Sequence, residues 1–73
     1  MTRAKIIGQL CKRHRRRLGL TQSYVAKQTG YTTANISSFE TGRNNNMFIL
    51  LWYVLNGLQT SELKEVYANG TKL

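Results

Sequence analysis

The sequence has 73 residues, which is the length of one small domain with a modest hydrophobic core. It holds 11 Lys and Arg against three Asp and Glu, a formal net charge of +8 at pH 7, which favours a polyanionic partner such as a nucleic acid or an acidic membrane surface. The single cysteine excludes an internal disulfide and suits a reducing cytosol. No apolar segment follows the basic first residues, so we expect no signal peptide and one cytoplasmic domain over residues 1–73, ordered at about 3–67.

The first predicted helix runs from Arg3 to about Leu18, with Thr2 as its cap. The positions that follow its three- and four-residue period are Ile6, Ile7, Leu10, Cys11, His14 and Leu18. A basic run from Lys12 to Arg17 winds around this helix. The run is either a solvated face or a phosphate-binding surface, because neutralised phosphates release counterions from DNA.

Two short helices joined by a tight turn are predicted next. The first begins after Thr21 and ends near Gln28, because a threonine before an apolar periodic segment can accept from the free N–H groups of the first turn. Gly30 tolerates a positive φ and can end that helix without strain. The second helix runs from Thr33 to about Glu40.

Apolar residues predict how these two helices meet. Val25 and Ala26 lie on one face of the first, and Ile36 and Phe39 share a face of the second. The outer face of the second helix is left with small uncharged side chains, which are Thr33, Ala34, Ser37, Ser38 and Thr41. A face without charge or bulk can enter a groove closely.

This arrangement resembles the phage-repressor (Cro-like, xenobiotic-response-element type) helix-turn-helix family. The matching segments are Leu20–Gln22, Val25–Ala26, Gly30, Ile36–Ser37 and Glu40–Arg43. The resemblance implies an all-α, lambda-repressor-like bundle of about five short helices. It departs from the family at Met47, where a proline is common, so it does not fix the course of the 43–47 loop. The alternative is an αα-hairpin in an unrelated helical domain.

The resemblance implies a homodimeric transcriptional regulator, with repression as the expected role, on a pseudo-palindromic double-stranded DNA operator in the nucleoid. The expected base contacts are Thr33, Ala34, Ser37 and Ser38. The expected phosphate contacts are Gln22, Asn35, Arg43, Asn44, Asn46, Arg13, Arg16 and Arg17, the asparagines having a plain turn-forming role as the alternative. It also implies a partly buried structural ion pair between Arg15 and Glu40.

The segment Met47–Leu55, MFILLWYVL, is apolar without a break but too short to span a bilayer. A helix here is apolar all round, so one small core cannot cover it. The residues expected to face inward are Leu51, Val54, Leu55 and Leu58. Those expected to face outward, as a dimer interface, are Phe48, Trp52 and Tyr53. The same surface can instead bind a regulatory protein partner, as in an antitoxin or antirepressor.

The end of this helix is left open by the sequence, at Asn56–Gly57 or at Gln59. Thr60 or Ser61 is expected to cap a last helix that ends near Tyr67. Residues 68–73 have the pattern of a frayed tail.

Catalytic and metal-binding patterns are not found in the sequence. Cys11 and His14 alone do not supply the four ligands of a usual metal site. No nucleophile–base set and no paired carboxylates occur. We therefore expect no enzymatic activity, cofactor, metal or small-molecule ligand. A peripheral membrane binder, using the basic first helix and the aromatic segment, is a further alternative.

Overall fold

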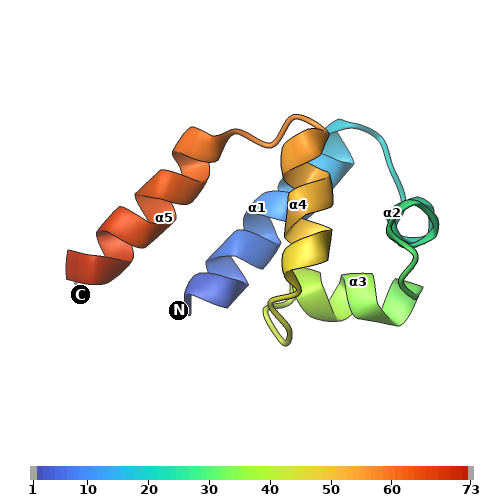
Figure 1. The fold of residues 1–73 in the computed structure, drawn as a ribbon, viewed down its shortest axis with the longest axis horizontal. Helices are drawn as coiled ribbons and strands as arrows, with labels where there is room; N and C mark the ends of the chain where they lie inside the picture. Colours follow the sequence, from blue (N-terminus) through green and yellow to red (C-terminus); the bar gives the residue numbers. More distant parts are fainter. Residues whose placement is uncertain (1, 73) are drawn as a thin grey trace.

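The computed structural model describes residues 2–72 of the protein, and the side chains of residues 2–68. The described chain contains five helices and no strand, namely α1 (Arg3–Arg17), α2 (Gln22–Thr29), α3 (Thr33–Glu40), α4 (Met47–Leu55) and α5 (Thr60–Lys72). Figure 1 shows α1 in the middle of the molecule, between α5 on one side and α2 and α3 on the other. α1 packs against α3, α4 and α5, and α2 packs against α3 and α4. The predicted all-α bundle with a central helix-turn-helix is confirmed.

Capping residues set the boundaries of the helix-turn-helix. Thr21 is the N-cap of α2, and its side-chain oxygen accepts a hydrogen bond from the backbone N–H of Tyr24. Gly30 ends α2 in the left-handed conformation, with φ of 80°. Thr32 then forms a capping box with Asn35 at the start of α3. These local signals explain why the predicted limits of α2 and α3 match the observed ones to within a residue.

The C-terminal part differs from the prediction in its length. α4 ends at Leu55 with Asn56 as C-cap, which decides between the two ends that the sequence left open. α5 begins at Thr60 itself and continues to Lys72, beyond the predicted end near Tyr67. The last helix is therefore longer than predicted, and Leu73 lies outside the described residues.

α1 closely approaches the end of α3 at Gly8. A Cβ atom on Gly8 would lie 2.7 Å from the backbone oxygen of Glu40 and still closer to that of Phe39. Only a residue without a side chain allows this approach. Gly8 thus helps to hold the C-terminal end of α3 against α1.

The core lies where the helices meet around α1. Its buried apolar side chains are Ile7, Cys11, Val25, Ala26, Ile36, Phe39, Ile49, Tyr53, Leu58 and Val66. The prediction that Val25, Ala26, Ile36 and Phe39 lie on the inner faces of their helices is thus confirmed. The α2–α3 pair is fixed to the rest of the domain by these side chains.

The predicted inward face of α4 is wrong at two positions. Leu51 and Leu55 are 51% and 75% exposed, whereas Ile49 and Tyr53 are fully buried. Tyr53 is therefore not an interface residue. In a helix that is apolar on every side, hydrophobicity cannot select the inward face, and the Tyr53 hydroxyl finds its acceptor inside the molecule.

The other two residues expected on the outer face of α4 differ from each other. Phe48 is 70% exposed, as predicted. Trp52 is half-buried against the core, with its ring edge-on to Tyr53 at 5.2 Å between centroids. The outward stripe of α4 is therefore made by Met47, Phe48, Leu51 and Leu55.

Candidate nucleic-acid interface

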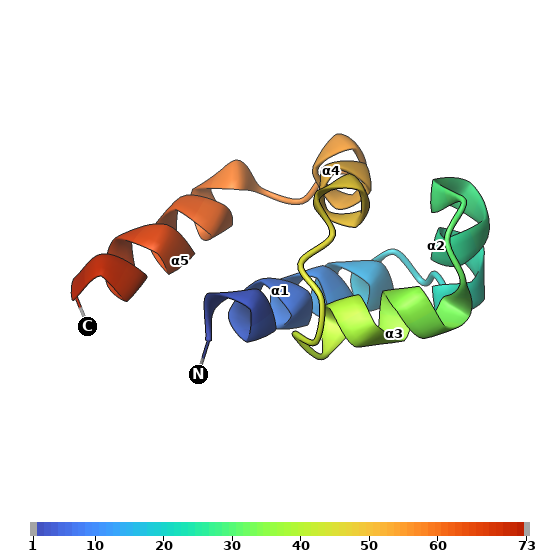
Figure 2. The ribbon, with the colours of Figure 1, turned by 60° about the horizontal axis from the view of Figure 1, so that its bottom comes forward.

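The outer face of α3 is the candidate recognition surface. In Figure 2, α3 lies along the lower edge of the molecule beside α1, and no other described helix covers its lower side. Thr33 and Ala34 are exposed, and Ser37 and Ser38 are half-buried. This surface is free of charged side chains, because the single charged residue of α3, Glu40, points into the core. A helix with such a face can approach base edges closely.

Glu40 is the centre of a buried network that joins four helices. Arg15 Nε lies 2.7 Å from Glu40 Oε2, and Arg15 Nη2 lies 3.1 Å from Oε1. Gln22 Nε2 donates to Oε1 at 3.0 Å, and the Tyr53 hydroxyl donates to Oε2 at 3.0 Å. The structure thus brings together Arg15 and Glu40. Gln22 and Tyr53 are partners of this carboxylate that sequence reasoning missed, although a tyrosine within an apolar helix signals a buried acceptor.

The network keeps Glu40 ionised. Burial acts to raise the pKa of Glu40, but hydrogen bonds from Arg15, Gln22 and Tyr53 outweigh it and lower the pKa below its usual value. Burial and the neighbouring carboxylate raise the pKa of Tyr53, so its hydroxyl remains a donor. Arg15 balances the carboxylate charge, and Glu40 therefore adds little repulsion toward an approaching phosphate.

A shallow polar cleft of about 490 Å³, largely open to solvent, lies between α1, α2 and the start of α3. Its lining residues are Lys12, Arg15, Arg16, Leu20, Thr21, Gln22, Ser23 and Thr33. The charge of Arg15 is matched by Glu40, so the positive charge of the cleft comes from Lys12 and Arg16. The cleft brings together two of the predicted phosphate contacts, Gln22 and Arg16, and places them beside Thr33.

The remaining basic residues of α1 lie elsewhere. Arg13 borders a neighbouring hollow on α1, with Gln9, Lys12 and Arg16. Arg17 lines neither of the two hollows. Lys12 lines both, and sequence reasoning missed it, although its spacing from Arg16 places the two side chains on one face of α1.

The asparagines around the 43–47 loop have structural hydrogen bonds. Asn46 Oδ1 accepts from the backbone N–H of Phe48 at 2.8 Å and so caps α4. Asn44 Nδ2 donates to the Asn35 backbone oxygen at 3.3 Å, and Asn44 Oδ1 accepts from the Asn46 backbone N–H at 3.2 Å. The predicted turn-forming role therefore exists in the fold. Asn46 keeps its side-chain N–H groups for an outside acceptor, and Arg43 is exposed beside this loop.

Cys11 and His14 both take part in the packing of the fold. Cys11 is fully buried, and His14 Nε2 lies 2.8 Å from the backbone oxygen of Asn56 at the end of α4. Among the described residues, no group of three His, Cys, Asp or Glu side chains lies close enough to hold a metal ion. None of the described helices is long and apolar enough to cross a membrane.

Comparison with known proteins identifies the family. A family model described as a helix-turn-helix domain matches residues 6–47, more than half of the sequence. The chain therefore belongs to the helix-turn-helix domain family, and the predicted family resemblance is confirmed. No solved structure matches the chain significantly.

Two relatives carry names that agree with this family. The chain is 35% identical over 66 residues to a protein named as an uncharacterized HTH-type transcriptional regulator of Sinorhizobium fredii, over 90% of this chain and 86% of the relative. It is 31% identical over 58 residues to a similarly named protein of Methanothermobacter thermautotrophicus, over 80% of this chain and 84% of the relative. The family and these names support a DNA-binding regulator.

Proposed function

We propose that this protein is a sequence-specific transcriptional repressor that binds a pseudo-palindromic double-stranded DNA operator as a homodimer. The observation that carries the proposal is the uncharged outer face of α3, with the basic cleft at its N-terminal end. A helix of this shape fits the major groove, and basic side chains beside it fit the phosphate backbone. Repression requires only that the protein occupy its operator, which a domain of this size can do.

The proposed reading of bases relies on short side chains. The proposed base contacts are Thr33, Ala34, Ser37 and Ser38. None of them is long enough for the bidentate pairing that Arg or Gln makes, so the methyl groups of Thr33 and Ala34 meet thymine methyls instead. Discrimination then comes from several modest contacts together with DNA shape.

The proposed phosphate contacts flank α3 at both ends. At the N-terminal end they are Gln22 and Arg16, beside the cleft, with Asn35 in the first turn of α3. At the C-terminal end they are Arg43, Asn44 and Asn46. Arg13 and Arg17 are exposed on α1 and add positive charge that attracts the duplex. Contacts on both sides of α3 would fix its orientation in the groove.

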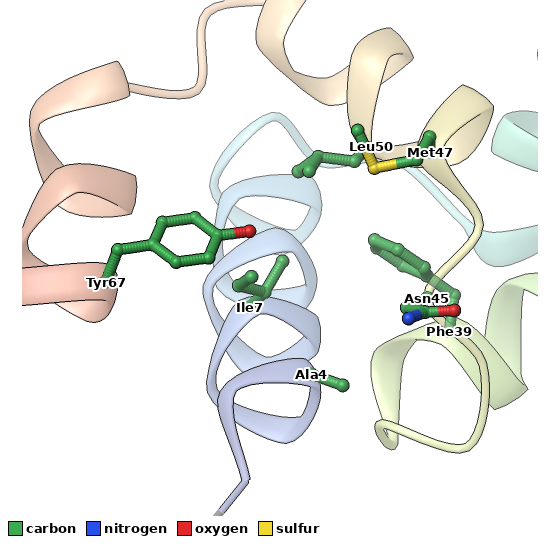
Figure 3. A pocket seen from close by; sticks show the side chains of 7 residues that line it. All are labelled: Ala4, Ile7, Phe39, Asn45, Met47, Leu50 and Tyr67. Carbon is green, nitrogen blue, oxygen red and sulfur yellow. The ribbon is translucent and has the colours of Figure 1, made fainter. Parts of the chain in front are cut away.

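The proposed dimer contact uses the outward stripe of α4. Met47 and Phe48 are each 70% exposed, and an apolar groove of about 230 Å³ lies beside Met47. Figure 3 shows Tyr67 of α5 on one side of this groove and Met47 and Leu50 on the other, with Ile7 between them. Adjoining exposed apolar surface of this kind commonly marks a subunit contact. Phe48 is its proposed anchor, and the exposed part of the half-buried Trp52 is proposed to join the contact.

The test is selection of bound fragments from native genomic DNA, followed by mobility-shift and footprinting measurements at moderate salt. We expect one enriched sequence with two related half-sites about one helical turn apart. Equal affinity for enriched and random duplexes would contradict sequence-specific binding. A footprint over a single half-site would contradict the dimer.

A second candidate function is a protein-interaction module on the same fold. The exposed stripe of Phe48, Leu51 and Leu55 favours it, because a protein partner covers such a surface as well as a second copy does. Under this function the purified protein would not shift duplex DNA at moderate salt. The mobility-shift measurement therefore separates the two candidates.

A further inference from the structure

Two cations in the cleft have no counter-charge among the described residues. Lys12 and Arg16 are four residues apart on α1, so they share one face of that helix and both line the cleft. The ion pair seen among the described residues is that of Arg15 with Glu40, which leaves the charges of Lys12 and Arg16 unbalanced. The cleft therefore attracts an anion.

The lining residues that α2 and α3 contribute are uncharged and rich in hydrogen-bonding groups. Gln22 contributes an amide that is held by Glu40 at 3.0 Å. The Ser23 and Thr33 hydroxyl oxygens lie 3.5 Å apart, so they join the start of α2 to the start of α3. Two cations beside hydroxyl and amide groups match a phosphodiester, whose charged oxygens accept from both kinds of donor.

We propose that Lys12 and Arg16 together hold one backbone phosphate of each DNA half-site in this cleft and so set the register of α3 along the groove. The inference rests on the proposed DNA binding and adds to it the place where one backbone phosphate is held. Thr33 belongs both to the cleft and to the outer face of α3, so a phosphate held there lies next to the bases that α3 reads. Phosphate contacts fix register without reading sequence themselves.

Ethylation interference on the selected operator tests this position. With the wild-type protein, ethylation of one phosphate per half-site, at the end where α3 begins, should block binding. In Lys12→Gln combined with Arg16→Gln, ethylation of that phosphate should no longer interfere, while ethylation at other contacts still does. Glutamine keeps α1 helical, and circular dichroism on the same samples checks the fold.

The same variants give a second readout in salt titrations. The double substitution should lower operator affinity roughly tenfold or more and make the log–log salt slope shallower by about one unit per half-site, because one phosphate contact per half-site is lost. Arg13→Gln is the matched control, because it removes the same charge from the same helix outside the cleft. It should keep interference at the cleft phosphate, even where it weakens general attraction or removes a contact of its own.

The possible failures are distinguishable. A cleft variant that keeps interference at that phosphate would overturn the cleft contact and leave the DNA-binding function standing. The same would follow if Arg13→Gln removed that interference as completely as the cleft variants do. A wild-type protein that binds no duplex would refute the proposed function, and the cleft contact with it.

Discussion

Arg15 and Glu40 lie 25 positions apart in the sequence, and in the fold Arg15 Nε is 2.7 Å from Glu40 Oε2. This pair ties the end of α3 to α1, and both side chains are largely withdrawn from solvent, with relative exposures of 10% and 1%. A buried pair of this kind makes each partner depend on the other.

Removing one partner should therefore destabilise the domain strongly. Arg15→Ala or Glu40→Ala is expected to cost on the order of 3 kcal/mol, because each strands a buried charge. That is a large part of the roughly 5 kcal/mol available to a small domain. A double-mutant cycle in urea unfolding measures the coupling free energy, with exposed Arg16→Ala as the control. Strictly additive losses would show that the two side chains do not interact.

Acid should weaken the fold through the same carboxylate. Because the folded-state pKa of Glu40 lies below the ordinary value of 4.5, its contribution is present above that pH and is lost as pH falls through the lowered pKa. Urea unfolding as a function of pH should show this fall in the wild-type protein. Glu40→Gln should flatten it, and Glu65→Gln, exposed on α5, should keep it. A wild-type slope that survives Glu40→Gln would assign acid sensitivity to another group.

Gly8→Ala should destabilise the protein, although alanine is the better helix former. At an exposed helical site this change adds stability by about 1 kcal/mol. Here the new Cβ would lie 2.7 Å from the Glu40 backbone oxygen, so α1 and α3 must separate. We expect a net loss of about 1–3 kcal/mol in thermal or urea unfolding. Gln9→Ala, on the exposed side of α1, is the control, and a stabilised Gly8→Ala protein would refute the close approach.

Ala34→Gln should change the DNA sequence preference and leave stability nearly unchanged. Ala34 is exposed on α3, and a glutamine there can pair with adenine in the major groove. Selection from random duplexes measures the preference, and thermal unfolding measures stability. Gln28→Ala, on the exposed end of α2, should give the wild-type profile. An unchanged profile for Ala34→Gln would remove Ala34 from the base-reading surface.

Phe48→Glu should shift the protein toward monomer while it stays folded. Phe48 is 70% exposed, so the substitution has little effect on the core but introduces charge into the proposed interface, where an aromatic anchor is worth about 2 kcal/mol or more. Sedimentation velocity with circular dichroism on one sample separates dissociation from unfolding. Binding to a full operator should fall far more than binding to a half-site.

The control for this change is Leu18→Glu, which alters an exposed apolar residue far from α4 in the sequence and should leave the sedimentation of the protein as it is in the wild type. Trp52→Ala is a less direct probe, because Trp52 also packs on the ring of Tyr53. A Phe48→Glu protein that still sediments as a dimer would show that Phe48 does not lie in the dimer interface. A wild-type protein that is monomeric even on its operator would exclude the dimer.

The sequence by itself determined the helices around the turn and the family to which they belong. Thr21, Gly30 and Thr32 act on backbone groups a few positions away, so caps and turns can be read from neighbouring residues. The spacing of Val25, Ile36 and their neighbours likewise fixed which sides of α2 and α3 face the core, because each helix has one apolar side.

The tertiary structure decided which of several equivalent faces is used. α4 is apolar on every side, and Tyr53 rather than Leu55 turns inward because the Glu40 carboxylate, distant in sequence, accepts its hydroxyl at 3.0 Å. α1 is basic around its circumference, and Lys12 with Arg16 lines the cleft because the starts of α2 and α3 lie on that side of α1. Which face of each helix turns inward depends on residues that are distant in the sequence and that only folding brings near. The periodicity of a helix with equivalent faces cannot predict it.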